Sequence, residues 1–422
     1  MSNMRNAPSD RDRGGSNAAG PLPVIQGMFT EAMRLHQAGR LAEAEQHYQK
    51  IVAIDPRHAD SLHLLGVIAY QTGRHAVAAD LIRHAIRLRR NVASYHANLG
   101  NVLQAQGKIT QAVAFYRHAL LLKPDYAEAH NNLGIALGSQ GKIAEAARQF
   151  ARAVALRPDY AEAQQNLGGA LEAAGKIAEA VTHYESSLAL RPNVPQIHAR
   201  LGDALHRLGK PAEAAVHYRH AIALTPNVAE LHGSLGNVLY GQGRIVDAAE
   251  QYRHALALNP DLAEAHNFLG NGLRAQNRLA DAMAHYQRAV SLRPDYAEAH
   301  NNLGNAYVVL GEQDMARKAY ETAIDLAPRV GLYYRHLLFV TAPVAGDRHL
   351  LAMERLAADM AALPSTDQME LHFALGKAYA DLGQHQRSFQ HLLAGNALKR
   401  RGIVYDEAAT LRTFERIRSV FT

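Results

Sequence analysis

The residues of this sequence best suited to chemistry are its asparagines and histidines, because both recur at regular spacing. Asparagine stands in repeated phrases such as AEAHNNLGNA and AEAHNNLGIA. Its side-chain amide both donates and accepts, so a row of such amides can bond to the backbone of an extended peptide of any sequence. No cysteine occurs in the chain, which excludes disulfides, thiolate nucleophiles and cysteine-ligated metals.

The 24 histidines suggest metal binding, but their spacing argues against it. Six of them recur at one place in a repeated unit: His96, His130, His198, His232, His266 and His300. Adjacent helical units lie about 10 Å apart, too far for two imidazoles to hold one metal at about 2.1 Å. We therefore expect these histidines at helix interfaces, and we predict neither a metal site nor a cofactor.

No catalytic centre can be recognised. The repeated Gly-Lys pairs, such as Gly107-Lys108, lack the Ser or Thr that follows in a phosphate-binding loop. Neither paired carboxylates with a plausible cleft nor a Ser-His-Asp set with a local signature is identifiable. We predict that the chain has no catalytic residues and is not an enzyme.

The charge pattern argues against nucleic acid and membrane partners. The formal charge of +6 is modest for 422 residues, and the basic residues are dispersed rather than gathered in a patch. The one dense cluster, Lys399 to Arg401, is typical of a solvated helix end. The polar first stretch contains no signal peptide, and no later segment is apolar enough to span a membrane. We predict a cytoplasmic protein with a disordered tail at residues 1–23.

A period of 34 residues organises most of the chain. Leu-Gly pairs mark it at Leu65-Gly66, Leu99-Gly100, Leu133-Gly134, Leu167-Gly168, Leu201-Gly202, Leu235-Gly236, Leu269-Gly270 and Leu303-Gly304. A proline, from Pro56 to Pro328, keeps the same period with Arg90 at the one missing place, and an alanine, from Ala44 to Ala316, keeps it without exception. Such a period indicates a repeat architecture.

Each repeated residue has a physical role in a pair of helices. The glycine after leucine and the repeated alanine allow the two helices to approach closely. A tyrosine, such as Tyr116, is expected to fill the space between units. A second glycine, such as Gly107, is expected to end the first helix in a left-handed conformation, with Asn277 substituting once. The proline ends the second helix.

This 34-residue unit resembles the tetratricopeptide repeat, and the resemblance covers residues 25 to 330. It implies an all-α fold, a right-handed α-solenoid superhelix of helix-turn-helix repeats. We predict nine regular units at 24–330, an irregular helical insertion at 331–368, a degenerate tenth unit at 369–402 and a capping helix at 403–422. His372, Leu375-Gly376, Gly383 and Phe389 echo the repeat in the tenth unit.

In a stack of helix pairs the first helices line the concave surface, so their outward positions are the candidates for binding. Counted from the start of each unit, the fifth, sixth and ninth positions share one helix face. The predicted peptide-binding residues there are Asn98, Asn101, Asn131, Asn132, Asn166, Arg200, Asp203, Asn237, Asn267, Phe268, Asn271, Asn301, Asn302 and Asn305. Asparagine costs up to roughly 0.7 kcal/mol against alanine within a helix. Two alternatives remain open: passive duplication of the asparagines, or their bonding between adjacent helices.

The asparagine row resembles the superhelical repeats of the O-GlcNAc transferase family, whose catalytic half is absent here. That resemblance implies that Asn98, Asn132, Asn166 and Asn302 contact protein substrates. Arg200, Ser234 and Phe268 interrupt the row, and Arg200 and Phe268 are expected to impose local selectivity.

The segment from Phe373 to Thr422 resembles the junction between repeats and catalytic domain in bacterial tetratricopeptide-repeat sulfotransferases. Two functions follow. The first is a scaffold that binds proteins or extended peptides along the concave surface. The alternative is the substrate-recruiting, non-catalytic half of a sulfotransferase or glycosyltransferase, with a transferase catalytic domain as a partner at the C-terminal end. A carboxylate clamp is not expected, because Gln196 and Asn131 stand where it needs cations.

Overall fold

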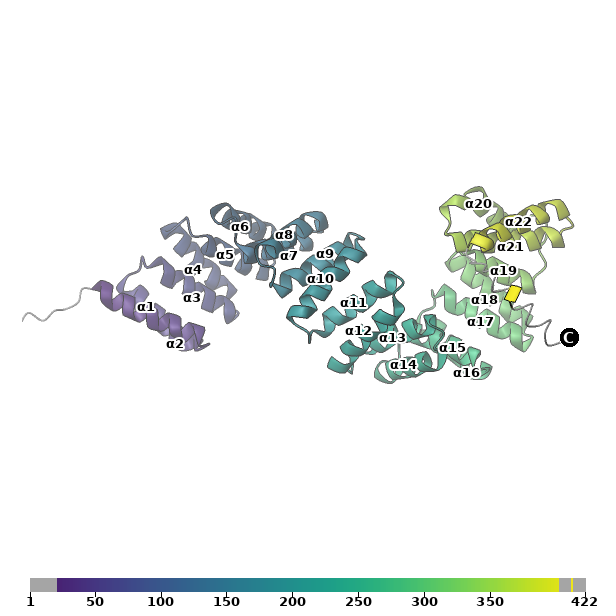
Figure 1. The fold of residues 1–422 in the computed structure, drawn as a ribbon, viewed down its shortest axis with the longest axis horizontal. Coiled ribbons are helices and arrows are strands. Elements are labelled where there is room, and N and C mark those ends of the chain that lie inside the picture. The colour runs from purple at the N-terminus through teal and green to yellow at the C-terminus, as the bar shows by residue number, and fades with distance from the viewer. Residues whose placement is uncertain (1–20, 402–410, 413–422) are drawn as a thin grey trace, which may run out of the picture. The chain divides into compact units, whose positions relative to one another are not determined.

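In a computed structural model the chain is a series of α-helices joined by short turns (Figure 1). The structure describes residues 21–401 and 411–412, and within these ranges no strand occurs. Up to Leu208 the helices are α1 (Pro21–Gln37), α2 (Leu41–Ile54), α3 (Ala59–Gln71), α4 (His75–Leu88), α5 (Ala93–Ala105), α6 (Ile109–Leu122), α7 (Ala127–Ser139), α8 (Ile143–Leu156), α9 (Ala161–Ala173), α10 (Ile177–Leu190) and α11 (Pro195–Arg207).

From Gly209 on the helices are α12 (Pro211–Leu224), α13 (Ala229–Gly241), α14 (Ile245–Leu258), α15 (Ala263–Ala275), α16 (Leu279–Leu292), α17 (Ala297–Leu310), α18 (Gln313–Leu326), α19 (Gly331–Val340), α20 (Arg348–Ala358), α21 (Ser365–Asp381) and α22 (His385–Arg401). A short 3-10 helix lies at Met360–Ala362. The predicted all-α fold is therefore confirmed. No helix in these ranges combines the length and apolar content needed to span a bilayer.

One 34-residue repeat corresponds to one pair of helices. In the pair α5 and α6 the helices have 13 and 14 residues, and a three-residue turn joins them. Gly107 in that turn has a φ of 74°, the left-handed conformation in which glycine meets no steric penalty. Asn277, predicted to replace this glycine once, has a φ of 58°. The turn chemistry predicted from the sequence is confirmed at both positions.

The glycine after the repeated leucine makes room for the side chain sixteen residues later, which is Ile82 for Gly66 and a ring for Gly100, Gly134, Gly168, Gly236, Gly270 and Gly304. A methyl group added at Gly100 would lie 2.5 Å from the ring of Tyr116, and one added at Gly134 would lie 2.6 Å from that of Phe150. The ring belongs to the second helix of the same unit, and rings such as Tyr252 and Tyr320 also contact the first helix of the next unit, as expected. Without a Cβ on the glycine, the two helices of a pair can pack around the ring.

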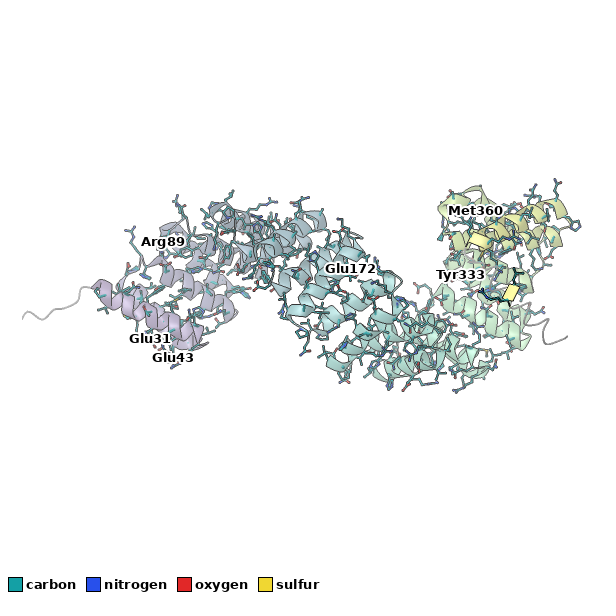
Figure 2. The ribbon with its side chains drawn as sticks, in the orientation of Figure 1. Glu31, Glu43, Arg89, Glu172, Tyr333 and Met360 are labelled. Carbon is teal, nitrogen blue, oxygen red and sulfur yellow. The ribbon has the colours of Figure 1, made fainter. Side chains whose placement is uncertain are left out.

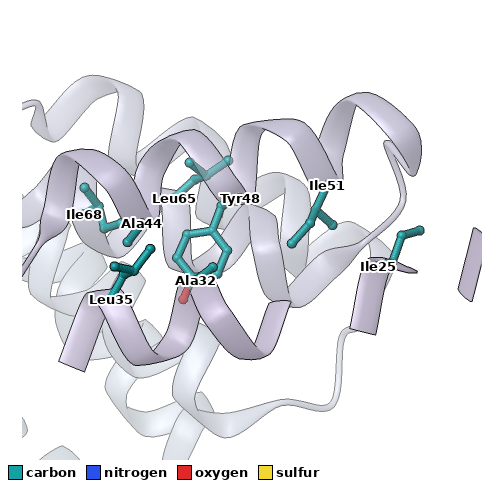
Figure 3. Packing of buried hydrophobic residues seen from close by; sticks show 8 residues of the cluster. All are labelled: Ile25, Ala32, Leu35, Ala44, Tyr48, Ile51, Leu65 and Ile68. Carbon is teal, nitrogen blue, oxygen red and sulfur yellow. The ribbon is translucent and has the colours of Figure 1, made fainter. Parts of the chain in front are cut away.

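The core runs from pair to pair rather than forming one centre. Its first cluster joins residues of α1, α2 and α3, with the ring of Tyr48 beside Ala32 and Leu35 (Figure 3). Ala44 lies in this cluster fully buried, and the alanines that repeat it, up to Ala316, are at most 1% exposed. The repeated alanine thus marks the line along which the helices of each pair meet.

Histidine at the fourth position of a first helix ties that helix to the preceding turn. Nε2 of His130 lies 3.1 Å from the carbonyl oxygen of Pro124. The same contact, six residues back, is made by His96, His198, His232, His266 and His300. The predicted place at a helix interface is confirmed for His130, His232 and His266, whose Nδ1 also contacts the second helix of the pair.

Repeat contacts continue beyond Pro328, inside the segment predicted as an irregular insertion. Tyr334 holds the fourth position of α19 and donates its hydroxyl to the carbonyl of Pro328 at 2.9 Å. Residue His336, at the sixth position, lies 2.8 Å from Oδ1 of Asn301 in the preceding unit. Helix α19 thus makes the contacts of a first helix, although it has 10 residues and α5 has 13. Its usual second helix is missing, because α21 packs directly on α19 while α20 lies beside α21.

The degenerate unit is the pair α21 and α22. A methyl group at Gly376 would lie 2.8 Å from Leu392, sixteen residues later, so leucine occupies the place of the repeated ring. Phe389, which echoes the repeat in the sequence of this unit, is 62% exposed. The predicted tail falls mostly outside the described residues, although α1 begins at Pro21, and the predicted capping helix at 403–422 also lies outside them except for residues 411–412.

Two compact units make up the chain, one ending at Leu208 and one beginning at Gly209. In each, consecutive helices pack on one another in chain order. A solenoid of helix pairs is thus present within each unit, and the right-handed superhelical course of the whole chain stays a prediction.

Candidate binding face of the first helices

The fifth, sixth and ninth positions of the first helices form what we call the amide face. On α3, α5 and α7 its side chains are hydrogen-bonded to one another. Nδ2 of Asn132 donates to Oδ1 of Asn101 at 2.9 Å, Nδ2 of Asn101 donates to Oδ1 of Asn98 at 3.4 Å, and Nδ2 of Asn98 lies 2.8 Å from Nε2 of His63. The amides therefore form a chain that ends on an imidazole.

The chain continues toward α9 through a buried amide. Asn166 donates to Oδ1 of Asn131 at 3.0 Å, and Asn131 donates to Oδ1 of Asn132 at 3.4 Å and to Glu162 at 3.3 Å. Asn131 itself is fully buried. A buried amide needs partners for its donors and acceptor, and here the neighbouring units supply them.

One contact is found at four places on this face: the sixth residue of a unit bonds to the fifth residue of the unit before it. Besides Asn166 with Asn131, Nδ2 of Asn302 donates to Oδ1 of Asn267 at 2.9 Å. This spacing of 35 residues also joins Asn98 to His63 and His336 to Asn301. The alternative that asparagines bond between adjacent helices is thus what the structure shows for these pairs.

The ninth position pairs with the repeated tyrosine of its own unit. Tyr116, Tyr252, Tyr286 and Tyr320 donate their hydroxyls at 2.8 Å to Asn101, Asn237, Asn271 and Asn305. Where the ring is Phe150, which has no hydroxyl, the ninth position holds Ile135 instead. This correlated change between repeats was present in the sequence and could have revealed the pairing.

The structure separates the predicted binding residues by exposure. Buried are Asn131, Asn267, Asn271, Asn301 and Asn302; half-buried are Asn98, Asn101, Asn132, Asn166, Phe268 and Asn305; exposed are Arg200, Asp203 and Asn237. The five buried residues, Asn302 included, bond to neighbouring helices, and ligand contact by the predicted residues stays a prediction. The role of these five is to bond the helix stack together.

Three pockets open beside the amide face before Leu208. One of about 210 Å³ is lined by residues that include Tyr70, Asn98 and Asn101, and one of about 370 Å³ by Tyr70, Asn101, Tyr116 and Asn132. The third, of about 300 Å³, includes Asn166 and Arg200 in its lining. The half-buried asparagines of this unit therefore reach concave, solvent-accessible space.

A charged cluster accompanies the third pocket. Glu172 on α9, labelled in Figure 2, accepts the hydroxyl of Tyr184 at 2.8 Å and lies 3.2 Å from Nη1 of Arg207 and 3.8 Å from Nη1 of Arg200. Burial, and then the bond to Glu172, raise the pKa of Tyr184 to about 12, so its hydroxyl stays protonated. Glu172 thus faces two guanidinium groups and one tyrosine hydroxyl.

Aromatic residues mark the amide face of the helices after Gly209. Phe268 stacks on Tyr252 with ring centroids 5.8 Å apart and planes at 15°, and its ring lies 6.4 Å from that of Tyr240. Asn237, the ninth residue of α13, is exposed. Its Oδ1 accepts a hydrogen bond from the hydroxyl of Tyr252. Phe268 therefore packs on its neighbours with one side of its ring and is only half-buried.

Sequence reasoning missed the partners of the fourth-position histidines. For His130, His232 and His266, the residue nineteen positions later on the second helix contacts the other ring nitrogen, as Gln149 does for His130 at 2.8 Å and His285 for His266 at 2.8 Å. Nε2 of His266 bonds to a carbonyl, so its Nδ1 accepts from Nδ1 of His285. In the described part of the chain no group of three or more His, Asp or Glu is placed to hold a metal ion.

Comparison with known families agrees with this architecture. Models of the tetratricopeptide repeat match residues 29–93 and 133–195, residues 100–141, 202–243, 236–273 and 270–311, and residues 297–330. Between 29 and 330 these matches leave only residues 94–99 and 196–201 uncovered. Fold and site define a helical-repeat protein. The chain belongs to the tetratricopeptide-repeat family.

Individual relatives are more distant. The human tetratricopeptide repeat protein 7B is 34% identical over 66 residues, which are 16% of this chain, so the chain spans only 8% of that protein's length. Among solved structures, Pseudomonas aeruginosa pilF is 25% identical with a TM-score of 0.45, covering 50% of this chain and 97% of its own. MamA is 24% identical with a TM-score of 0.36, covering 39% and 95%. YrrB, described as having an unusual peptide-binding site, is 21% identical with a TM-score of 0.41, covering 44% and 95%.

Proposed function

We propose that the chain is a protein-interaction scaffold that binds extended peptide segments of partner proteins along the amide face before Leu208. The observation that carries this proposal is the row of half-buried amides, held by mutual hydrogen bonds, beside three pockets. An amide group keeps a second N–H after donating one bond, so Asn98, Asn132 and Asn166 can each offer a donor to a peptide carbonyl.

The bonds within the row also favour binding. A side chain that is already fixed loses little rotamer freedom when a ligand arrives, and such losses cost about 0.5–1.5 kcal/mol per side chain. Asn166 adds an acceptor, since among the described residues its Oδ1 has no hydrogen-bond donor. Amides can thus pair with the peptide backbone while pockets receive side chains, which separates affinity from specificity.

The test is selection of binders from a random dodecapeptide display library on the purified full chain, followed by affinity measurement. Changing Asn98, Asn132 and Asn166 together to alanine should weaken the selected peptides at least tenfold, about 1.4 kcal/mol. The matched control changes Asn237 and Asn305 to alanine, because these amides occupy the amide face of the helices after Gly209. Circular dichroism checks that all variants keep their helicity.

Two outcomes would contradict the proposal: no peptide is selected, or the triple variant binds as the unchanged chain does. If the control variant weakens binding equally, the site is not confined to the part of the chain before Leu208, and this result also contradicts the proposal. The alternative role as the recruiting half of a transferase, a transferase domain as partner and a cytoplasmic location all stay predictions from the sequence.

A further inference from the structure

The pocket between α7, α8, α9 and α11 differs from the rest of the amide face. Its volume is about 300 Å³, and its lining is largely apolar, with Ile135, Phe150 and Ala170 among the residues. Asn166 and Arg200 are the groups that bring polarity to it, together with Gln165. An apolar hollow flanked by a cation is the composition of a side-chain pocket.

The lining of this pocket is apolar because three exceptions to the repeat meet in one place. In the pair α5 and α6 the hydroxyl of Tyr116 bonds to Asn101 and Gln104, and these three side chains line the pocket of about 370 Å³ with polar groups. In the next pair, Phe150, Ile135 and Gly138 stand at those three positions. The polar network is absent there, and space lined by carbon atoms takes its place.

Helix α9 adds Gly169, a glycine that packing does not require. A methyl group at Gly169 would meet nothing nearer than 3.8 Å, the hydroxyl of Tyr184, and one at Gly138 nothing nearer than 4.0 Å. By contrast, one at Gly168 would lie 2.7 Å from the ring of Tyr184. Glycine within a helix is less stable than alanine, so Gly169 in the middle of α9 keeps a space open against local helix stability.

Charge at the edge of the pocket indicates what enters it. Arg200 takes the sixth position, where Asn98, Asn132 and Asn166 stand in other units, and it is exposed. Its Nη1 would lie 3.9 Å from a methyl group at Gly169, so the guanidinium borders the open space. Glu172 lies closer to Arg207 than to Arg200, at 3.2 Å against 3.8 Å, which leaves Arg200 able to pair with a further carboxylate.

We propose that this pocket selects peptides in which a bulky apolar residue stands next to an acidic one. The apolar side chain fills the space above Gly138 and Gly169, and the neighbouring carboxylate pairs with Arg200. This inference rests on the proposed function, because Asn132 and Asn166 hold the peptide backbone beside the pocket.

The experiment uses the full chain and four pools of fluorescein-labelled heptapeptides with amidated C-termini, randomised except for a central Leu-Asp, Ser-Asp, Leu-Asn or Ser-Asn. Amidation removes the terminal carboxylate as a competing partner for Arg200. Fluorescence anisotropy should show at least tenfold tighter binding of the Leu-Asp pool than of the other three. This comparison needs no variant of the protein.

Variants then assign the two preferences. Changing Gly138→Gln together with Gly169→Asn introduces residues that other units carry at these positions, Gln104 and Asn101, and should reduce binding of the Leu-Asp pool to that of the Ser-Asp pool. Arg200→Asn should reduce it to that of the Leu-Asn pool. Gly233→Ala, at an open helix position in the second unit, is the control and should change neither preference.

The outcomes separate this inference from the function on which it rests. If all four pools bind equally well, peptide binding stands and the selective pocket is refuted. If no pool binds, both are refuted. Should the double variant lose helicity by circular dichroism, the four-pool comparison and Arg200→Asn still decide, and an unchanged Asp preference in Arg200→Asn refutes the role of the cation.

Discussion

His63 ends the amide chain only while its imidazole is neutral. Its Nε2 lies 2.8 Å from Nδ2 of Asn98, an N–H donor, so this ring nitrogen must accept and cannot carry a proton. The ring is 7% exposed and stacks on Tyr95 at 4.4 Å. Burial lowers the pKa of His63 from 6.5 to about 4, although Asp60 opposes this shift. Protonation would bring two donors together and open the end of the chain.

We therefore expect stability to depend on pH through this residue. The unfolded chain takes up the proton below pH 6.5, whereas the folded chain does so only near pH 4, so unfolding becomes easier as pH falls between these values. Between these pH values the free energy of unfolding should fall less in His63→Asn than in the unchanged chain, by on the order of 2 kcal/mol. Asparagine accepts the same bond at this position in other units. Urea unfolding at several pH values measures this difference. Identical pH profiles for both proteins would contradict the assignment.

Helix α19 shows how a single contact decides the arrangement of elements. Its first residue, Gly331, is buried, and its backbone N–H donates to Oδ1 of Asp367 on α21 at 3.1 Å. A methyl group there would lie 2.5 Å from the carbonyl oxygen of Asp367 and 2.7 Å from the amide nitrogen of Leu371. Both are backbone atoms and cannot rotate away. Close approach at this glycine is what allows α21 to replace a missing second helix.

Gly331→Ala should consequently loosen α21 and α22 from the stack. Overpacking of this kind costs about 1–3 kcal/mol, and hydrogen exchange should report faster exchange in α19 and α21 than in α15 and α16. The control is Gly233→Ala on α13, where a methyl group meets nothing within 4 Å and should stabilise the helix by about 0.5–1 kcal/mol. Unchanged protection of α21 in the Gly331 variant would show that the contact does not hold it.

At the scale of the whole molecule, each helix contacts mainly its neighbours in the chain, and the core extends along the stack. The stability of such an array is approximately the sum of its repeats and their interfaces. Cutting between pairs then removes complete units, whereas cutting within a pair leaves one helix without the partner that covers its leucines. The part of the chain before Leu208 allows both kinds of cut, since Leu190 ends α10 and Ala173 ends α9.

We expect a fragment ending at Leu190 to keep its helicity per residue and to melt cooperatively. A fragment ending at Ala174 should instead lose protection throughout α9, because Leu167, Gly168 and Leu171 are exposed once α10 is absent. Thermal melting followed by circular dichroism, with hydrogen exchange of the α9 amides, compares the two. Equal protection of α9 in both fragments would argue against the pair as the unit of stability.

The sequence by itself determined the features that depend on local geometry. A period of 34 residues, the helix pair, the left-handed turn at Gly107 and Asn277 and the buried alanine line all follow from residue types at fixed spacing. Each of these features depends on conformational preference or on side-chain size within one unit. The interface role of the histidines followed in the same way, from their recurrence in every unit rather than in one place.

Only the tertiary structure decided which asparagines face solvent. Asn131 and Asn132 are adjacent in sequence, yet the first is buried under the next unit and the second borders a pocket, because neighbouring residues on a helix point about 100° apart. The same packing decided that Leu392 rather than Phe389 fills the place of the repeated ring, and that the exceptions at Gly138, Phe150 and Gly169 meet in one pocket. Burial and shared space arise between units, and a repeat read alone contains neither.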